Sequence, residues 1–240
     1  MGLSVHCQAL PCYDCFGDSM KIAEHLYIYL WGDPRENNCN SIFIDGKTPL
    51  LIDPGHGHRV NDLFGRMRED GVDPERIRMI VCTHAHPDHF SGTAAFHGSH
   101  QKIAISREEE KYIEDIGRPM YVQQGIQMPD YRVDFYLREG DLVVGKHELQ
   151  VLLTPGHSPG SICIFWPRYK ILFSGDVVFA QGVGRADLPG GNAAALKQSV
   201  KRLSELPVEI IVPGHGPVIQ GSAQVRSNFE FVTRALANVR

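Results

Sequence analysis

Four apolar segments of the chain each end directly before a residue of a type that binds metals. The segments are 77–83, 149–156, 170–175 and 209–214, and the residues that follow them are His84, His157, Asp176 and His215. In α/β proteins the chemistry sits in loops at strand ends, because the sheet fixes the backbone while the loop exposes side chains. The pattern therefore predicts strands that bring these four side chains to one edge of the fold.

The first of these loops carries the densest group of ligand-type residues. His84, His86, Asp88 and His89 supply three imidazoles and a carboxylate within six residues, so the loop can face two metals. These donors suit Zn²⁺, Fe²⁺ or Mn²⁺, and the lack of cysteine in the loop argues against a closed structural zinc site. Pro87 restricts the residue before it to extended geometry, and we expect a splayed loop here rather than a helix. The alternative, surface histidines on a polar loop, does not explain the three further residues at strand ends.

The remaining pattern indicates an α/β protein with one domain. Strands are expected at 41–45, 77–83, 149–153, 161–165, 170–174 and 209–212, and helices at 57–69, 107–115, 193–206 and 222–239. No linker divides residues 1–240, so residues 1–20 are expected to be an N-terminal extension of a single domain. Residues 107–140 are interpreted as an insertion that forms either a lid over the site or a packed helix and loop.

Composition narrows the partners and the compartment. A net charge of −4 and a pI near 6.3 give no broad basic field, so nucleic acid is not an expected partner. Neither a signal peptide nor a membrane span is recognisable, and we expect a cytoplasmic protein without a membrane partner. Cys7, Cys12 and Cys15 are interpreted as ordinary thiols, with a metal or redox site as the alternative.

The ligand-rich segments resemble the metallo-β-lactamase-fold superfamily. The resemblance rests on the segment from Thr83 to Gly92, on Leu51-Ile-Asp-Pro-Gly55, on Gly156-His157, on Ser174-Gly-Asp176 and on Pro213-Gly-His-Gly216. It implies an αββα four-layer sandwich with the metals at one edge. It also implies one metal on His84, His86 and His157, a second on Asp88, His89 and His215, and Asp176 as a bridge between them. Two Zn²⁺ ions are expected, with Fe²⁺ or Mn²⁺ as alternatives.

Two metals activate a water and polarise a carbonyl, so no side-chain nucleophile is needed. Asp88 is the expected catalytic residue, orienting the hydroxide and accepting a proton. The Asp176 and His215 positions resemble the glyoxalase II and persulfide dioxygenase branches. The favoured function is hydrolysis of a small-molecule thioester or related acyl bond, and the main alternative is a persulfide dioxygenase with one Fe²⁺. Lactonase and phosphodiesterase activities stay open within the hydrolase class, and a complete ligand set disfavours a non-catalytic binding module.

Substrate contacts are predicted less directly. Gly182 to Gly191 resembles a segment of small glyoxalase II-like proteins and persulfide dioxygenases, so Arg185 and Asp187 are expected to line or brace the site; a flexible glycine loop is the alternative. Only 25 residues follow His215, which puts a strict glutathione thioester in doubt, because longer glyoxalase II enzymes grip glutathione with a C-terminal helical domain. Arg226 and Arg234 are interpreted as a solvated helix face, and a homodimer is left open.

Overall fold

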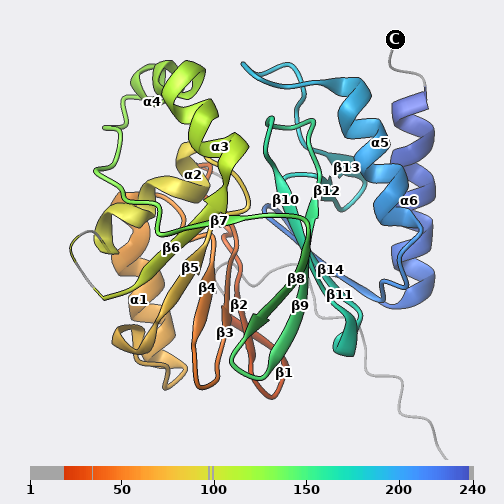
Figure 1. The fold of residues 1–240 in the computed structure, drawn as a ribbon. Coiled ribbons are helices and arrows are strands. Elements are labelled where there is room, and N and C mark those ends of the chain that lie inside the picture. The colour runs from red at the N-terminus through yellow and green to blue at the C-terminus, as the bar shows by residue number, and fades with distance from the viewer. Residues whose placement is uncertain (1–18, 34, 97, 99, 238–240) are drawn as a thin grey trace, which may run out of the picture.

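Two β-sheets face each other and helices cover the outer face of each, as Figure 1 shows. The computed structural model describes residues 19–33, 35–96, 98 and 100–237. The expected four-layer αββα sandwich is confirmed. Cys7, Cys12 and Cys15 lie outside the described residues.

The first sheet has seven strands that follow one another in sequence order. They are β1 (Ser19–Ala23), β2 (Leu26–Tyr29), β3 (Ser41–Ile44), β4 (Leu50–Ile52), β5 (Met79–Val81), β6 (Lys102–Ser106) and β7 (Phe135–Leu137). Pairing is antiparallel from β1 to β4 and parallel from β4 to β7. The parallel half places the end of β5, and the loop after it, at one edge of the sandwich.

The second sheet has six strands in the order β15-β14-β11-β10-β9-β8. They are β8 (Gly140–Val144), β9 (His147–Leu153), β10 (Ile162–Trp166), β11 (Ile171–Gly175), β14 (Ile210–Pro213) and β15 (Ile219–Gln220), and a two-stranded ribbon of β12 (Val178–Phe179) and β13 (Gly182–Val183) lies beside them. β11 and β14 are parallel, so the residues that follow both strands lie at the same edge.

Helices flank the first sheet on one side and the second sheet on the other (Figure 1). Against the first sheet lie α1 (Val60–Glu69), α2 (Pro87–Phe90), α3 (Arg107–Tyr112), the π-helix η4 (Ile113–Gly117) and α4 (Arg118–Gln123). Against the second lie α5 (Ala193–Ser204) and α6 (Ser222–Ala237). Short 3₁₀ turns complete the chain at η1 (Gly57–Arg59), η2 (Pro74–Arg76), η3 (Ser91–Phe96) and η5 (Pro167–Tyr169). None of the helices in the described part of the chain is both long and apolar enough to cross a membrane.

Alternating side chains of each strand enter two different apolar layers. In β3, Ile42 and Ile44 pack between the sheets while Phe43 packs under the helices of the first sheet. In β10, Ile164 faces the other sheet and Phe165 faces α5 and α6. Strands that are buried on both faces have unbroken apolar sequences, which explains why they were recognisable without the structure.

Two expectations about the segment around β5 need correction. The strand predicted at 77–83 is only Met79–Val81, because residues 74–76 form η2 and Thr83 turns its N–H to the Asp53 carboxylate. The prediction of a non-helical loop after Pro87 was wrong, since Pro87 begins α2. His86 is extended as expected (φ −67°, ψ 150°), and proline suits the first helical position because no N–H is needed there.

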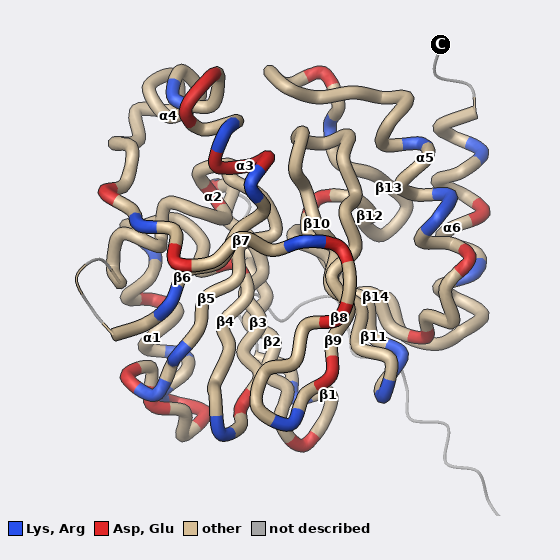
Figure 2. The backbone as a smooth tube through the Cα atoms, viewed as in Figure 1, with Lys and Arg blue, Asp and Glu red and all other residues tan. Residues whose placement is uncertain are grey.

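Charge is spread over the whole described backbone. Figure 2 shows Lys and Arg interspersed with Asp and Glu on both sheets and on the helices. Several form local ion pairs, such as Arg202 with Glu139 and Lys102 with Asp134.

Candidate metal centre

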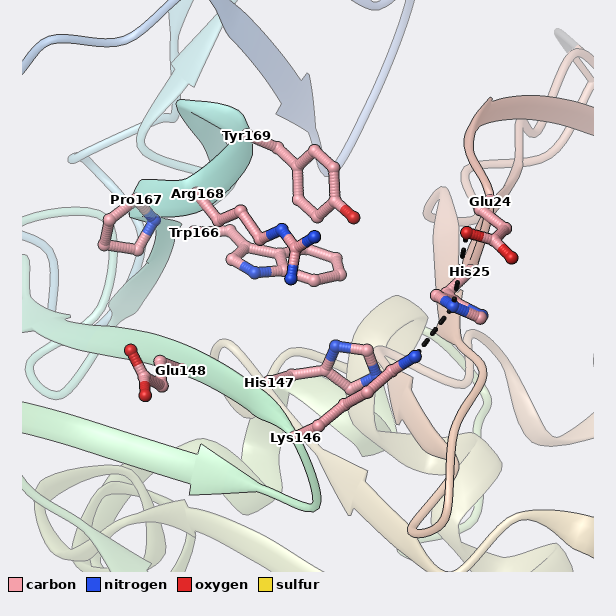
Figure 3. A pocket seen from close by; sticks show the side chains of 9 residues that line it. All are labelled: Glu24, His25, Lys146, His147, Glu148, Trp166, Pro167, Arg168 and Tyr169. Carbon is pink, nitrogen blue, oxygen red and sulfur yellow. Dashed lines mark hydrogen bonds and ion pairs between the residues drawn. The ribbon is translucent and has the colours of Figure 1, made fainter.

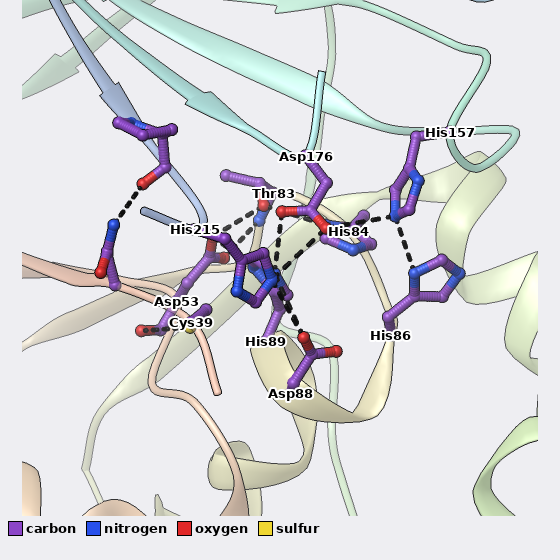
Figure 4. Close-up of polar contacts among 12 residues, drawn as sticks. Cys39, Asp53, Thr83, His84, His86, Asp88, His89, His157, Asp176 and His215 are labelled. Carbon is purple, nitrogen blue, oxygen red and sulfur yellow. Dashed lines mark hydrogen bonds and ion pairs between the residues drawn. The ribbon is translucent and has the colours of Figure 1, made fainter. Parts of the chain in front are cut away.

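Three histidines converge from two loops on opposite sheets. His84 follows β5, His86 precedes α2, and His157 lies between β9 and β10. Each offers one ring nitrogen, and the three nitrogens lie within 4.8 Å of one another. His157 Nε2 is 2.8 Å from His86 Nδ1 (Figure 4), and all three side chains are buried. We call this set the three-histidine group.

A second set combines a carboxylate with two imidazoles. Asp88 and His89 belong to α2, and His215 follows β14. His215 Nε2 is 3.1 Å from Asp88 Oδ2 and 3.2 Å from His89 Nε2. The ligand atoms of this set also lie within 4.8 Å of one another. We call it the aspartate group.

Asp176 stands between the two groups. Its Oδ1 lies 3.1 Å from His89 Nε2, and its Oδ2 lies 3.5 Å from both His157 Nε2 and His215 Nε2. The carboxylate fits closely against the neighbouring loop, because a Cβ on Gly214 would lie only 2.3 Å from Asp176 Oδ1. Asp176 therefore lies within 3.5 Å of ring nitrogens from both groups.

The donor chemistry fits divalent metal ions. His84 Nε2 is buried without a hydrogen-bond partner among the described residues, and an unpaired buried polar atom is costly unless something binds it. The ring nitrogens of His86 and His157 face each other at 2.8 Å, as do those of His89 and His215 at 3.2 Å. Imidazole nitrogen and carboxylate oxygen in such clusters suit zinc, iron(II) or manganese(II).

The two groups differ in protonation. Burial lowers the pKa of His86 to about 3, and the neighbouring His157 adds to this effect. Burial also lowers the pKa of His84 well below its usual value, so burial favours the neutral, metal-binding form of both His84 and His86.

The aspartate group carries the opposite tendency. Burial opposes charge on His215, yet Asp176 and Asp88 raise the pKa of His215 to about 9. Burial likewise opposes charge on Asp88, and His89 and His215 hold the pKa of Asp88 at about 2. These carboxylates thus require a positive partner, and a divalent cation supplies one in place of the protons on the rings.

Three contacts behind the ligands fix how they are presented. His89 Nδ1–H donates to Asp53 Oδ2 at 2.9 Å, which directs Nε2 to the centre, and His157 Nδ1–H donates to the Arg185 carbonyl at 2.7 Å. Asn37 Nδ2 donates to Asp88 Oδ2 at 2.6 Å. The sequence analysis did not predict Asp53 or Asn37 as supporting residues. Asp53 directly follows the buried strand β4, and this position could have marked it as a site residue. No pattern in the sequence around Asn37 marks it in the same way.

Unlike the predicted metal ligands, Arg185 and Asp187 have exposed side chains. Their side chains pair with each other, at 2.9 Å and 2.7 Å, and each is 68% exposed. Arg185 reaches the centre through its carbonyl rather than its guanidinium. Arg226 and Arg234 belong to α6, on the outer face of the second sheet.

Two surface hollows lie at opposite ends of the strands. One of about 270 Å³ opens beside His215 and is lined by Trp31, Gly32, Asp33, Glu36, Asn37 and Asn38. Another of about 240 Å³, shown in Figure 3, lies where β9 begins, at the far end from His157. The first hollow borders the ligand residue His215, whereas the second borders none of the seven predicted ligands.

Comparison with known proteins adds the family context. The model of the metallo-beta-lactamase superfamily matches residues 34–215. The chain is 33% identical over 190 residues to the probable metallo-hydrolase YqgX of Bacillus subtilis, covering 77% of this chain and 87% of that protein.

Two further relatives have named activities. Hydroxyacylglutathione hydrolase GloC of Haemophilus influenzae is 31% identical over 205 residues, covering 80% of this chain and 92% of that protein. The acyl-coenzyme A thioesterase MBLAC2 of Gallus gallus is 30% identical over 223 residues, covering 83% and 80%. Among solved structures, TTHA1623 in a di-iron-bound form superimposes with a TM-score of 0.68 at 30% identity, covering 89% of this chain and 98% of that one.

Proposed function

Because the chain belongs to the metallo-β-lactamase superfamily, we propose that this metallo-hydrolase cleaves a thioester of a small molecule, with a centre for two divalent metals. The observation that carries the proposal is the placement of Asp176 between two complete ligand groups. His84, His86 and His157 would hold one ion, Asp88, His89 and His215 the other, and Asp176 both. Two metals bound there would supply the Lewis acidity that activates water and polarises the acyl carbonyl.

Asp88 is proposed to move the proton. Its carboxylate is 6% exposed, and its Oδ2 is already held by Asn37 and His215, so its orientation is fixed. It would take the proton of the attacking water and deliver it to the departing thiolate sulfur, which leaves as a thiol while the acyl group becomes a carboxylate. No serine or cysteine nucleophile is required.

The thioester bond is supported by two relatives, a hydroxyacylglutathione hydrolase and an acyl-coenzyme A thioesterase. Zinc is the proposed metal, with iron the main alternative because a structural neighbour is described in a di-iron-bound form. Imidazole and carboxylate donors accept either ion.

The test is a paired assay on protein purified without oxygen. Metal content is measured first, and activity is then followed as thiol release from hydroxyacylglutathione and acyl-coenzyme A thioesters and as oxygen uptake with a glutathione persulfide. Thiol release that chelators abolish and zinc restores supports the proposal. Oxygen consumption with one iron per chain, and no thiol release, would assign the persulfide dioxygenase reaction instead.

A further inference from the structure

The helical segment formed by α3, η4 and α4, residues 107–123, packs against the loops that carry the three-histidine group. We call it the clasp. Tyr112, Ile113 and Tyr121 are buried within it and join the apolar layer outside the first sheet. A carboxylate, Glu109, is 0% exposed among them although it takes no part in the proposed reaction.

Glu109 connects the two loops that supply the three histidines. Its Oε2 accepts the backbone N–H of Ala85 at 2.8 Å, and its Oε1 accepts the N–H of Gly160 at 2.7 Å and the Ser158 hydroxyl at 2.5 Å. Ala85 lies between His84 and His86, and Ser158 directly follows His157. One buried carboxylate thus holds loops from both sheets at a fixed separation.

The clasp also binds the backbone carbonyl of Ala85. The Tyr121 hydroxyl donates to the Ala85 carbonyl at 2.9 Å, while Glu109 accepts the Ala85 N–H. Both backbone groups between the two histidines are therefore fixed by one segment. The Tyr112 hydroxyl also lies 3.5 Å from His86 Nε2, on the ring edge opposite the nitrogen that faces the centre.

Close packing leaves the loop after His157 little freedom against the clasp. A Cβ on Gly160 would lie 2.4 Å from Ser106 Oγ and 2.6 Å from Glu109 N, so only glycine allows this approach. Ser106 also donates its hydroxyl to the Gly160 carbonyl at 2.7 Å. The loop is held at both polar groups of Gly160.

The aspartate group depends on other residues. Asn37 contacts Asp88, and Asp53 contacts His89, and both come from the part of the chain before α1. Asn37 thus contacts the aspartate group alone. Asp53 serves both groups, because its carboxylate also accepts the N–H and the hydroxyl of Thr83, the residue before His84. Among the described contacts, those of Glu109 and Tyr121 are confined to the loops of the three-histidine group.

We propose that the clasp sets the spacing of His84, His86 and His157, and that Glu109 and Tyr121 are positioning residues for the metal at that group. The proposal rests on the metal centre of the proposed function and not on its substrate. In this proposal, residues 107–123 preform the metal site of the three-histidine group.

Glu109→Gln is the direct test because glutamine has the same size as glutamate. Each carboxylate oxygen of Glu109 accepts a backbone N–H, and in the variant an amide NH₂ replaces one of these oxygens and cannot accept it. Contacts behind metal ligands contribute about 10–100-fold in affinity. We expect Glu109→Gln to weaken metal binding at the three-histidine group by this factor, and Tyr121→Phe to weaken it less, because phenylalanine removes one hydrogen bond. Glu108→Gln, an exposed neighbour on the same helix, is the matched control.

The measurement is a Co²⁺ titration of metal-free protein, followed by visible absorbance. His86→Ala removes a ligand of the three-histidine group, and the absorbance step that this variant loses is assigned to that group. Selective weakening of that step in Glu109→Gln, with the other step and Glu108→Gln unchanged, supports the proposal. Equal weakening of both steps, or none, would overturn it.

A folding check completes the experiment. Thermal unfolding of each metal-free variant shows whether the fold is retained, and if Glu109→Gln fails to fold, Tyr121→Phe decides the question by the same selective criterion. No substrate is used, so an absence of thioesterase activity would refute the proposed function without affecting this result.

Discussion

The three-histidine group and the aspartate group differ in charge and in exposure. In the former, burial lowers the pKa values of His84 and His86, and all three histidines are at most 4% exposed. The latter carries a carboxylate and ends in His215, whose side chain is 23% exposed beside the 270 Å³ hollow. The clasp holds one and the N-terminal half of the first sheet holds the other. We therefore expect the buried three-histidine group to be preformed for one ion, and substrate and water to arrive at the more exposed, charged aspartate group.

Asp176→Ala should have the largest effect, because Asp176 contacts both groups. Both metal affinities should fall by more than the ~100-fold expected for a contact behind the ligands, and turnover should be lost. Metal analysis after dialysis, together with the thioester assay, measures this. If the variant loses only one ion, Asp176 does not bind both metals.

Asp88→Asn should separate the two groups. We expect kcat to fall by about 10²–10⁴-fold, since the proton acceptor is removed, and the metal of the aspartate group to bind more weakly. The Co²⁺ spectrum of the three-histidine group should persist. Full turnover with both ions in place would remove Asp88 from the proton path.

Asp53→Asn should also weaken the aspartate group, because Asp53 orients the His89 ring. The asparagine side chain has only one acceptor oxygen, so it cannot accept the His89 N–H, the Thr83 N–H and the Thr83 hydroxyl together. His89 then loses the contact that fixes its tautomer. Affinity at the aspartate group should fall about 10–100-fold, with the three-histidine group less affected. A titration that shows the reverse order would contradict the division of supports.

Asn37→Ala should have a smaller effect of the same kind. It removes one hydrogen bond to a charged carboxylate, which amounts to about tenfold in affinity at the aspartate group. It is the counterpart of Glu109→Gln, because the two variants should weaken opposite steps of one Co²⁺ titration. If Asn37→Ala and Glu109→Gln weaken the same step of the titration, the two groups do not depend on different supporting residues.

Arg185→Ala should change metal binding least. The Arg185 guanidinium pairs with Asp187 on the surface, where solvent screens the pair and its contribution to stability is small, while the carbonyl that holds His157 remains. Metal affinity should stay within about twofold, so any rise in KM for the thioester would report substrate contact. Unchanged KM would remove Arg185 from the substrate site.

The sequence predicted those parts of the molecule that depend on local pattern. The strands that lead into His84, Asp176 and His215 were identifiable because they are largely buried on both faces and therefore apolar throughout. The strand that leads into His157 is buried mainly on one face, and it was identifiable from its apolar residues at alternate positions. Shorter or less apolar strands such as β1 and β7 were missed, because their place in the sheet depends on neighbours rather than on their own residues. The helical start at Pro87 was missed because proline fits the first turn of a helix as well as a loop.

The supporting contacts could not be predicted in this way. Asn37 lies 51 positions from Asp88, and Glu109 lies 51 positions from Gly160, so neither pair forms a pattern along the chain. Glu109 stands in a helix of acidic residues where its sequence neighbours are exposed or partly exposed. Only the packing of α3 against both ligand loops distinguishes it.

The central claim is that two metals act together on a thioester, and stepwise metal addition tests it most directly. Metal-free protein is titrated with Zn²⁺ while thiol release is measured at each addition. The account predicts two ions per chain, with activity rising as the second binds at the aspartate group. Full activity after the first equivalent, with no further change on adding the second, would contradict it.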